Sequence, residues 1–128
     1  MKPLLLLSLT LVLSGCYLAN GSPSQTNFWI KNGKVVPYTD INTCKINANN
    51  ILGERYIYLL DKFDNDYMVF RNNTQEYQEF SKYTEKQSIL INECLYQKGY
   101  RFNAPLYWCL AQDGDNTRTC IENMKYRK

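Results

Sequence analysis

The apolar N-terminal run sets how much of this chain is available to fold. Lys2 gives a short positive start, and Pro3 to Leu13 follow as the apolar run. A membrane-spanning helix needs about 20 apolar residues, and this run is too short. The small residues just before position 16 are typical of a signal-peptide cleavage site. We therefore expect residues 1–15 to be a secretory signal peptide, and the remaining 113 residues suffice for one modest hydrophobic core.

The end of this run, Leu13-Ser14-Gly15-Cys16, resembles the lipobox of bacterial lipoproteins. The resemblance implies that lipoprotein signal peptidase cuts before Cys16 after its thiol has received a diacylglyceryl group. Cys16 is then the first mature residue, its covalent lipid is the only cofactor that we expect, and multiple acyl chains make a durable anchor. Tyr17 stands where Gram-negative lipoproteins kept at the inner membrane typically carry Asp, which implies the outer membrane, facing the periplasm or the surface. The alternative is an ordinary secreted protein with an incidental Cys16.

The residues after Cys16 have the composition of a tether. Gly21-Ser22-Pro23-Ser24 is small, polar and poor in core-forming side chains. We expect a lipidated cysteine and flexible tether over 16–27 and one globular domain over 28–128. Phe28 and Trp29 open this domain, and we interpret them as core anchors rather than as an exposed binding stripe.

Apolar residues at helical spacing predict three helices, over about 39–52, 54–70 and 74–98. Asn32-Gly33 before the first of them is a turn signal. The second stretch has a competing interpretation as a hairpin about Asp64-Asn65, and the helical period narrowly favours the helix.

The C-terminal part lacks this periodicity. We predict extended or irregular pieces at 100–102 and 106–109, a turn at Asp113-Gly114-Asp115-Asn116 and renewed order at 120–124. The predicted fold is mainly α, possibly α+β, and it ends in an irregular or hairpin-like disulfide loop.

Beyond Cys16 the chain has four cysteines, at Cys44, Cys94, Cys109 and Cys120. An even number in a small exported domain predicts two disulfides, for which three pairings are possible. We favour Cys44 with Cys94, which would join the apolar faces of two helices, and Cys109 with Cys120, which would close the Asp-Gly turn. The alternative of a four-thiolate metal site lacks any Cys-x-x-Cys pair, so no metal is expected.

Three short segments together resemble a loose group of small Gram-negative outer-membrane lipoproteins. They are Trp29-Ile30-Lys31-Asn32-Gly33, Cys44, and Cys94-Leu95-Tyr96-Gln97-Lys98-Gly99-Tyr100. The resemblance supports the Cys44 to Cys94 disulfide and implies no particular activity. The stretch 54–73 and the Cys109 to Cys120 loop lie outside the shared pattern, so we expect any specialised function there.

Charge and composition exclude several functions. The chain has no histidine, so it cannot form a Ser-His-Asp or Cys-His nucleophile system or a histidine-containing metal site. Its net charge is only +3, and basic and acidic residues alternate without a block of one sign, so nucleic acid is not an expected partner.

Two groups of side chains are candidate sites. Carboxylates for glycosidic chemistry are one possibility, although a solvated helix face explains them better: Glu54, Asp61, Asp64 and Asp66. The other group combines aromatic rings with a guanidinium, as binding hot spots do: Tyr100, Arg101, Phe102, Tyr107 and Trp108. Here the favoured interpretation is a core beside the disulfide, and the alternative is a contact surface.

We expect a lipid-anchored envelope protein that acts as a non-enzymatic binding or accessory module at the outer membrane. Its partners would be the membrane, through the lipid, and an envelope or surface protein. The alternative function is a carboxylate-dependent envelope hydrolase that acts on glycan or peptidoglycan.

Overall fold

The computed structural model describes residues 21–111 and 114–128, and Cys16 and Asp113 lie outside them. The described residues are mainly helical with one small sheet, which confirms the predicted fold class. Along the chain the elements are η1 (Gln25–Phe28), β1 (Trp29–Lys31), β2 (Lys34–Val35), α2 (Tyr38–Leu52), α3 (Glu54–Asn65), α4 (Tyr67–Asn72), α5 (Thr74–Gln97), β3 (Arg101–Phe102), α6 (Leu106–Cys109), α7 (Asn116–Asn123) and η2 (Met124–Tyr126).

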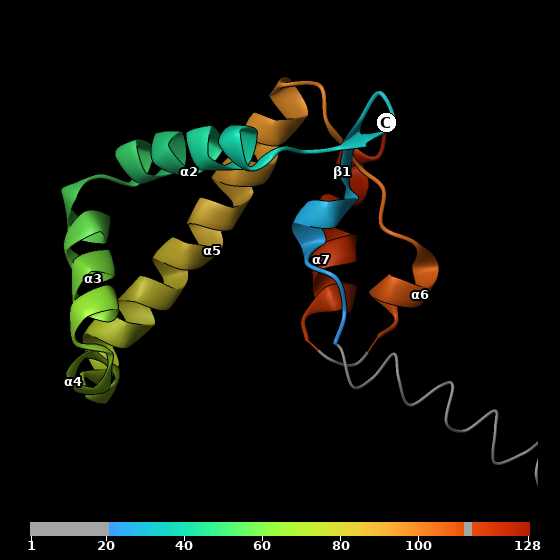
Figure 1. Cartoon of the computed structure of the whole chain (residues 1–128). Coiled ribbons are helices and arrows are strands. Elements are labelled where there is room, and N and C mark those ends of the chain that lie inside the picture. The colour runs from blue at the N-terminus through green and yellow to red at the C-terminus, as the bar shows by residue number, and fades with distance from the viewer. Residues whose placement is uncertain (1–20, 112–113) are drawn as a thin grey trace, which may run out of the picture.

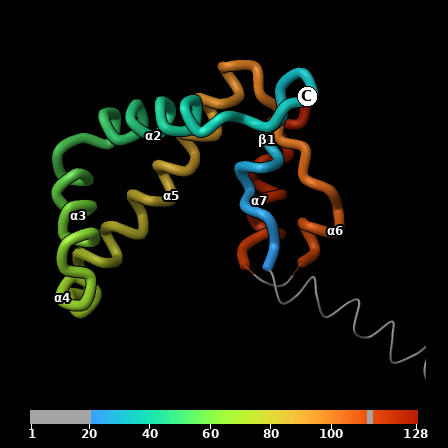
Figure 2. Tube along the Cα trace, viewed as in Figure 1, coloured from blue at the N-terminus to red at the C-terminus, as the bar shows by residue number. Residues whose placement is uncertain are grey.

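In the view of Figure 1 the helices form an arch. α2 crosses the top, α3 and α4 descend at one end, and β1, α6 and α7 lie at the other. α5 runs diagonally from α4 back to α2, and the tube in Figure 2 follows the same course. Because α2 packs along α5, these two helices connect both ends of the arch.

Each end of the arch has a hydrophobic core of its own. The proximal core, at the sheet end, consists of Trp29, Val36, Cys44, Leu95, Tyr100, Phe102, Ala104, Trp108, Cys109, Cys120 and Tyr126. The arm, which we define as α3 and α4 (residues 54–72), packs on the first half of α5 through a second core: Tyr56, Leu59, Phe70 and Phe80. The buried apolar surface of the described residues is therefore divided between the proximal core and this second core, which we call the arm core.

The sheet confirms the turn and the core anchor at the start of the domain. β1 pairs antiparallel with both β2 and β3, in the order β2-β1-β3. Asn32 and Gly33 join β1 to β2 with positive φ angles of 52° and 73°, as a tight hairpin turn requires. Trp29 is only 1% exposed and packs its ring against Phe102 and Tyr126.

The helix predictions are confirmed with small changes at their ends. α2 begins at Tyr38, directly after Pro37, and stops at Gly53. The hairpin alternative for the next stretch is wrong, because 54–72 forms two helices that break at Asp66. The cap of α5 is Asn73, whose side chain accepts a hydrogen bond from the backbone N–H of Glu76.

Both favoured disulfides are present. Cys44 in α2 is bonded to Cys94 in α5, and Cys109 in α6 to Cys120 in α7. The prediction of an extended or irregular piece at 106–109 is wrong, since α6 is a helical turn that begins after Pro105. One turn is too short to show a helical period in the sequence.

Residues 21–27, the described part of the predicted tether, have defined structure. Gln25–Phe28 forms the 3-10 helix η1, capped by the side chain of Ser24. Pro23 and Ser22 accept hydrogen bonds from side chains of α6 and α7. Residues 21–27 are therefore joined to the globular domain by these contacts.

Candidate functional site

The structure places most of the aromatic candidate residues inside the proximal core. Tyr100, Phe102 and Trp108 are 6%, 0% and 2% exposed, as the core interpretation of this segment expected. Arg101 is half-buried; its guanidinium donates to the carbonyl of Tyr100 at 2.8 Å and stacks 4.2 Å from the ring centroid of Tyr96. Of the five candidate residues, only Arg101 and the exposed Tyr107 present an appreciable part of their side chains to solvent.

The carboxylates of the alternative hydrolase lie on the outside of the arm. Glu54, Asp61, Asp64 and Asp66 are all exposed, along α3 and at its end. Asp61 accepts a hydrogen bond from the amide of Asn65, one turn later, at 2.8 Å. This arrangement fits the solvated face that the sequence favoured. Among residues 21–111 and 114–128, no three side chains of the Cys, Asp or Glu type are placed to hold a metal ion.

Two of the three segments that carry the lipoprotein resemblance meet at the C-terminal end of α5. Lys31 of the first motif donates from its Nζ to the carbonyl of Lys98 at 2.7 Å. Its aliphatic chain lies so close to Gly99 that a Cβ there would approach Lys31 Cε to 3.3 Å, and the φ of Gly99 is +93°. Lys31 therefore binds a carbonyl at the C-terminal end of α5, and Gly99, far from it in sequence, adopts the left-handed conformation that ends the helix.

Asp40 at the start of α2 completes this junction. Its carboxylate accepts hydrogen bonds from the phenol of Tyr100 and from Lys98 Nζ, the latter at 3.2 Å. The Tyr100 hydrogen bond, followed by that of Lys98, lowers the pKa of Asp40, and the same bond raises the pKa of Tyr100. These contacts hold α2 against the C-terminal end of α5. We call α2, α5 and the sheet, which the motif residues join, the frame of the domain.

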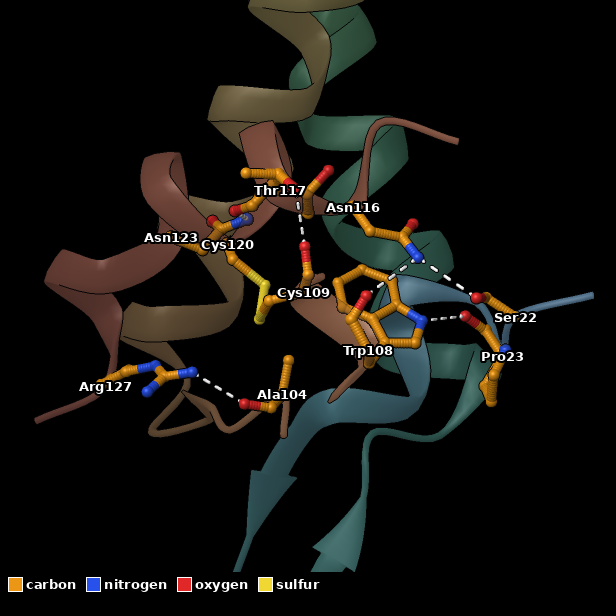
Figure 3. The surroundings of a disulfide bond; sticks show 11 residues. Ser22, Pro23, Ala104, Trp108, Cys109, Asn116, Thr117, Cys120, Asn123 and Arg127 are labelled. Carbon is orange, nitrogen blue, oxygen red and sulfur yellow. Dashed lines mark hydrogen bonds between the residues drawn. A yellow bond between two sulfur atoms is a disulfide. The ribbon is translucent and has the colours of Figure 1, made fainter. Parts of the chain in front are cut away.

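A second polar junction holds the beginning of the described chain (Figure 3). Trp108 Nε1 donates to the carbonyl of Pro23 at 2.8 Å, and Asn116 Nδ2 donates to Ser22 Oγ at 3.2 Å and to the Trp108 carbonyl at 3.1 Å. We call Gly21, Ser22 and Pro23, with Trp108 and Asn116, the anchor corner. It fixes the point from which the chain leads back toward Cys16.

The Cys109 to Cys120 disulfide lies beside the anchor corner (Figure 3). Thr117 Oγ1 donates to the Cys109 carbonyl at 2.6 Å, and Arg127 donates to the carbonyl of Ala104 at 2.7 Å. Asn92 donates to the buried Asn123 at 2.9 Å and joins α7 to α5. The corner is thereby rigidly connected to the long diagonal helix.

The arm is fixed to α5 by ion pairs around its core. Arg55 donates to both carboxylate oxygens of Glu79, at 3.0 and 2.6 Å, and Lys62 donates to Glu76 at 2.6 Å. The hydrogen bond that Arg55 donates lowers the pKa of Glu79, and the hydrogen bond that Lys62 donates to Glu76 raises the pKa of Lys62. Burial raises the pKa of Tyr56, which lies within the arm core.

Large apolar side chains remain exposed at the tip of the arm. Met68 and Val69 of α4 are 68% and 65% exposed, and Tyr67 beside them is 41% exposed. We call these three residues the arm tip. Their neighbour Phe70 is buried and turns into the arm core. The sequence did not predict the arm tip, because one apolar stripe was assigned to each helix. The feature that could have revealed it is an apolar run that is longer than a six-residue helix can bury.

Two of the cavities on the described surface lie outside the two polar junctions. One, of about 350 Å³, opens between α5 and α7 and is lined by polar side chains that include Glu85, Arg118 and Glu122. Arg118 is already ion-paired with Asp115 and Glu122. The other, of about 430 Å³, is a shallow groove at the α2–α3 elbow beside Ile57.

The comparisons with known proteins supply neither a fold nor a function for this chain. No family model, no curated protein and no solved structure matches this chain. Within the described residues, no helix combines the length and the apolar character needed to cross a membrane.

Proposed function

We propose that this protein is a lipid-anchored module of the outer membrane that presents its arm to a protein partner in the cell envelope. The lipobox supports lipidation at Cys16. The two disulfides fit an exported chain, because disulfides persist in oxidising compartments outside the cytoplasm. The mode of action is binding rather than catalysis.

One observation carries this proposal: the arm has a core of its own and still exposes apolar side chains at its tip. Exposed apolar residues that are grouped together mark interaction sites on soluble domains. The tip adjoins the first turn of α5, whereas the anchor side is joined to α5 at Asn92. Thr74 and Asn92 lie about 27 Å apart along the helix at 1.5 Å per residue. The arm therefore projects well away from the anchor corner.

A lipid anchor makes such a surface effective at low abundance. Confining the domain and its partner to one membrane raises their effective concentration, so a small apolar patch suffices for binding. The arm lies in the stretch 54–73, which is outside the pattern shared with similar lipoproteins. A partner specific to this chain is thus expected to contact the arm rather than the frame.

The test has two parts. Fatty-acid labelling of the wild type and of Cys16→Ala, followed by membrane fractionation, tests the anchor. Chemical cross-linking in intact cells then tests the arm, with a Met68→Ser/Val69→Ser variant and a matched control, Ile121→Ser/Met124→Ser. The control residues are 65% and 63% exposed but lie at the other end of the arch.

We expect label on the wild type alone, and a cross-linked partner that the arm variant loses and the control keeps. Equal capture by both variants would refute the role of the arm. Hydrolysis of peptidoglycan fragments by the purified wild type would favour the hydrolase alternative.

A further inference from the structure

The short helix α6 exposes a second apolar surface, which the arm does not include. Leu106 and Leu110 are 71% and 62% exposed, while Trp108 and Cys109 between them are buried. The backbone N–H of Leu110 donates to the carbonyl of Leu106 at 3.0 Å, so the two leucines lie one turn apart. Side chains at this spacing share one face of a helix. We call this pair the α6 face.

The α6 face belongs to the same helical turn that holds the start of the described chain. Trp108, from this turn, donates to the carbonyl of Pro23. Figure 1 shows α6 beside the place where the chain passes to the residues before Gly21. The position of α6 relative to the exit of the chain is therefore fixed by the anchor corner.

The remaining distance to the lipid is short. Only five peptide links separate Gly21 from Cys16. At up to 3.6 Å per residue these links span at most about 18 Å. The headgroup layer on each side of a bilayer is itself roughly 5–8 Å thick. A lipid on Cys16 thus keeps the anchor corner, and α6 with it, next to the membrane surface.

The sequence around α6 suits lipid better than the sequence around the arm tip or around Ile46 does. No charged residue occurs from Phe102 to Ala111. By contrast, Asp66 and Arg71 flank the arm tip, and Lys45 precedes the exposed Ile46 of α2. Entry into the headgroup region is costly for charged side chains and favourable for leucine. The uncharged α6 segment avoids that cost.

We propose that the α6 face inserts into the bilayer that carries the lipid of Cys16, at the boundary between headgroups and acyl chains. This inference rests on the proposed lipid anchor. Leu106 and Leu110 then form a second point of attachment, and Tyr107 lies at the depth that tyrosine prefers in membranes. A lipid alone leaves a domain free to turn about its tether, whereas two points of attachment fix its orientation and so the direction in which the arm projects.

The experiment uses tryptophan as a depth reporter in the full-length, lipidated protein. Leu106→Trp and Leu110→Trp place an indole on the α6 face, and Ile46→Trp, at a site 50% exposed on α2, is the matched control. The native Trp29 and Trp108 are buried and provide a common background that the wild type measures. Each protein is reconstituted in phosphatidylethanolamine–phosphatidylglycerol vesicles with increasing amounts of lipid brominated on its acyl chains.

We expect the added emission of both α6 reporters to shift to the blue and to be mostly lost with brominated lipid, and that of Ile46→Trp to be unchanged. Mass spectrometry of the N-terminal peptide separates the possible failures. Lipidated protein without quenching at either leucine overturns the α6 face and leaves the anchor intact. A blue shift without quenching assigns the face to protein contact and also overturns it. An N-terminal peptide without lipid overturns the proposed anchor and this inference together.

Discussion

The two disulfides offer a direct test of how this small domain is stabilised. The Cys44 to Cys94 disulfide encloses a separation of 50 residues, and the Cys109 to Cys120 disulfide one of 11. If each acts by restricting the unfolded chain, the larger loop contributes about 4 kcal/mol and the smaller about 3 kcal/mol to the free energy of unfolding. The paired variants Cys44→Ala/Cys94→Ala and Cys109→Ala/Cys120→Ala remove them separately.

Thermal unfolding followed by circular dichroism measures both effects. In a domain of this size each kcal/mol corresponds to roughly 4 °C in Tm. We therefore expect Tm to fall by about 16 °C without the first disulfide and by about 12 °C without the second. Alanine is the chosen replacement because Cys44 is fully buried and a serine hydroxyl there would lack a partner.

The order of the two effects decides whether the reasoning holds. A larger loss on removal of the Cys109 to Cys120 disulfide would refute the loop-entropy argument. It would show that this disulfide acts through the native contacts of the anchor corner, where Cys109 adjoins Trp108 and its carbonyl accepts from Thr117. If both paired variants unfolded at the same Tm as the wild type, the stabilising contribution assigned to each disulfide would be refuted.

Three further predictions concern the ends of the arch. Phe70→Ala should lower the free energy of unfolding by about 3–5 kcal/mol and raise amide hydrogen exchange in the arm before the sheet, and uniform exchange would contradict a separate arm core. The pKa of Asp40 is lowered by its hydrogen bond from Tyr100, so the stabilisation exists above the unfolded value of 3.8 and is lost as pH falls through the lower folded pKa. Tyr100→Phe should therefore be less stable than the wild type at neutral pH, with a difference that shrinks below about pH 4 in acid titrations; a constant difference would disprove the coupling. Trp108→Phe should cost about 1 kcal/mol and expose the chain near Pro23 to proteases, and unchanged cleavage there would show that the indole hydrogen bond does not hold it.

The frame of the domain could be predicted because its signals are local. Cys44 and Cys94 fall on helical stripes, Asn32-Gly33 specifies a hairpin turn, and Gly99 ends α5. Each of these residues acts through its own backbone conformation or through the period of its helix. The same local rules found helices rather than a hairpin in the arm.

The candidate surfaces could not be predicted because they depend on long-range contacts. Trp108 and Met68 are both large apolar residues in short helices, yet one is 2% and the other 68% exposed. The difference comes from Phe28 and Phe102, whose rings lie 4.8 and 6.4 Å from that of Trp108. The pairing of β1 with β3 places Phe102 opposite Trp29, the residue after Phe28, and composition carries no information about that pairing.

The junction at the C-terminal end of α5 is separate from the arm. Lys31, Lys98, Gly99 and Tyr100 interact at one end of α5, and Asp40 ties α2 to the same point. None of these contacts involves the arm, which packs on the other half of α5 through its own core. Changes in 54–72 are therefore free to alter the arm tip without disturbing the junction that holds the anchor side together. Under the proposed function, this separation lets the arm tip change while the end of the domain next to the anchor stays the same.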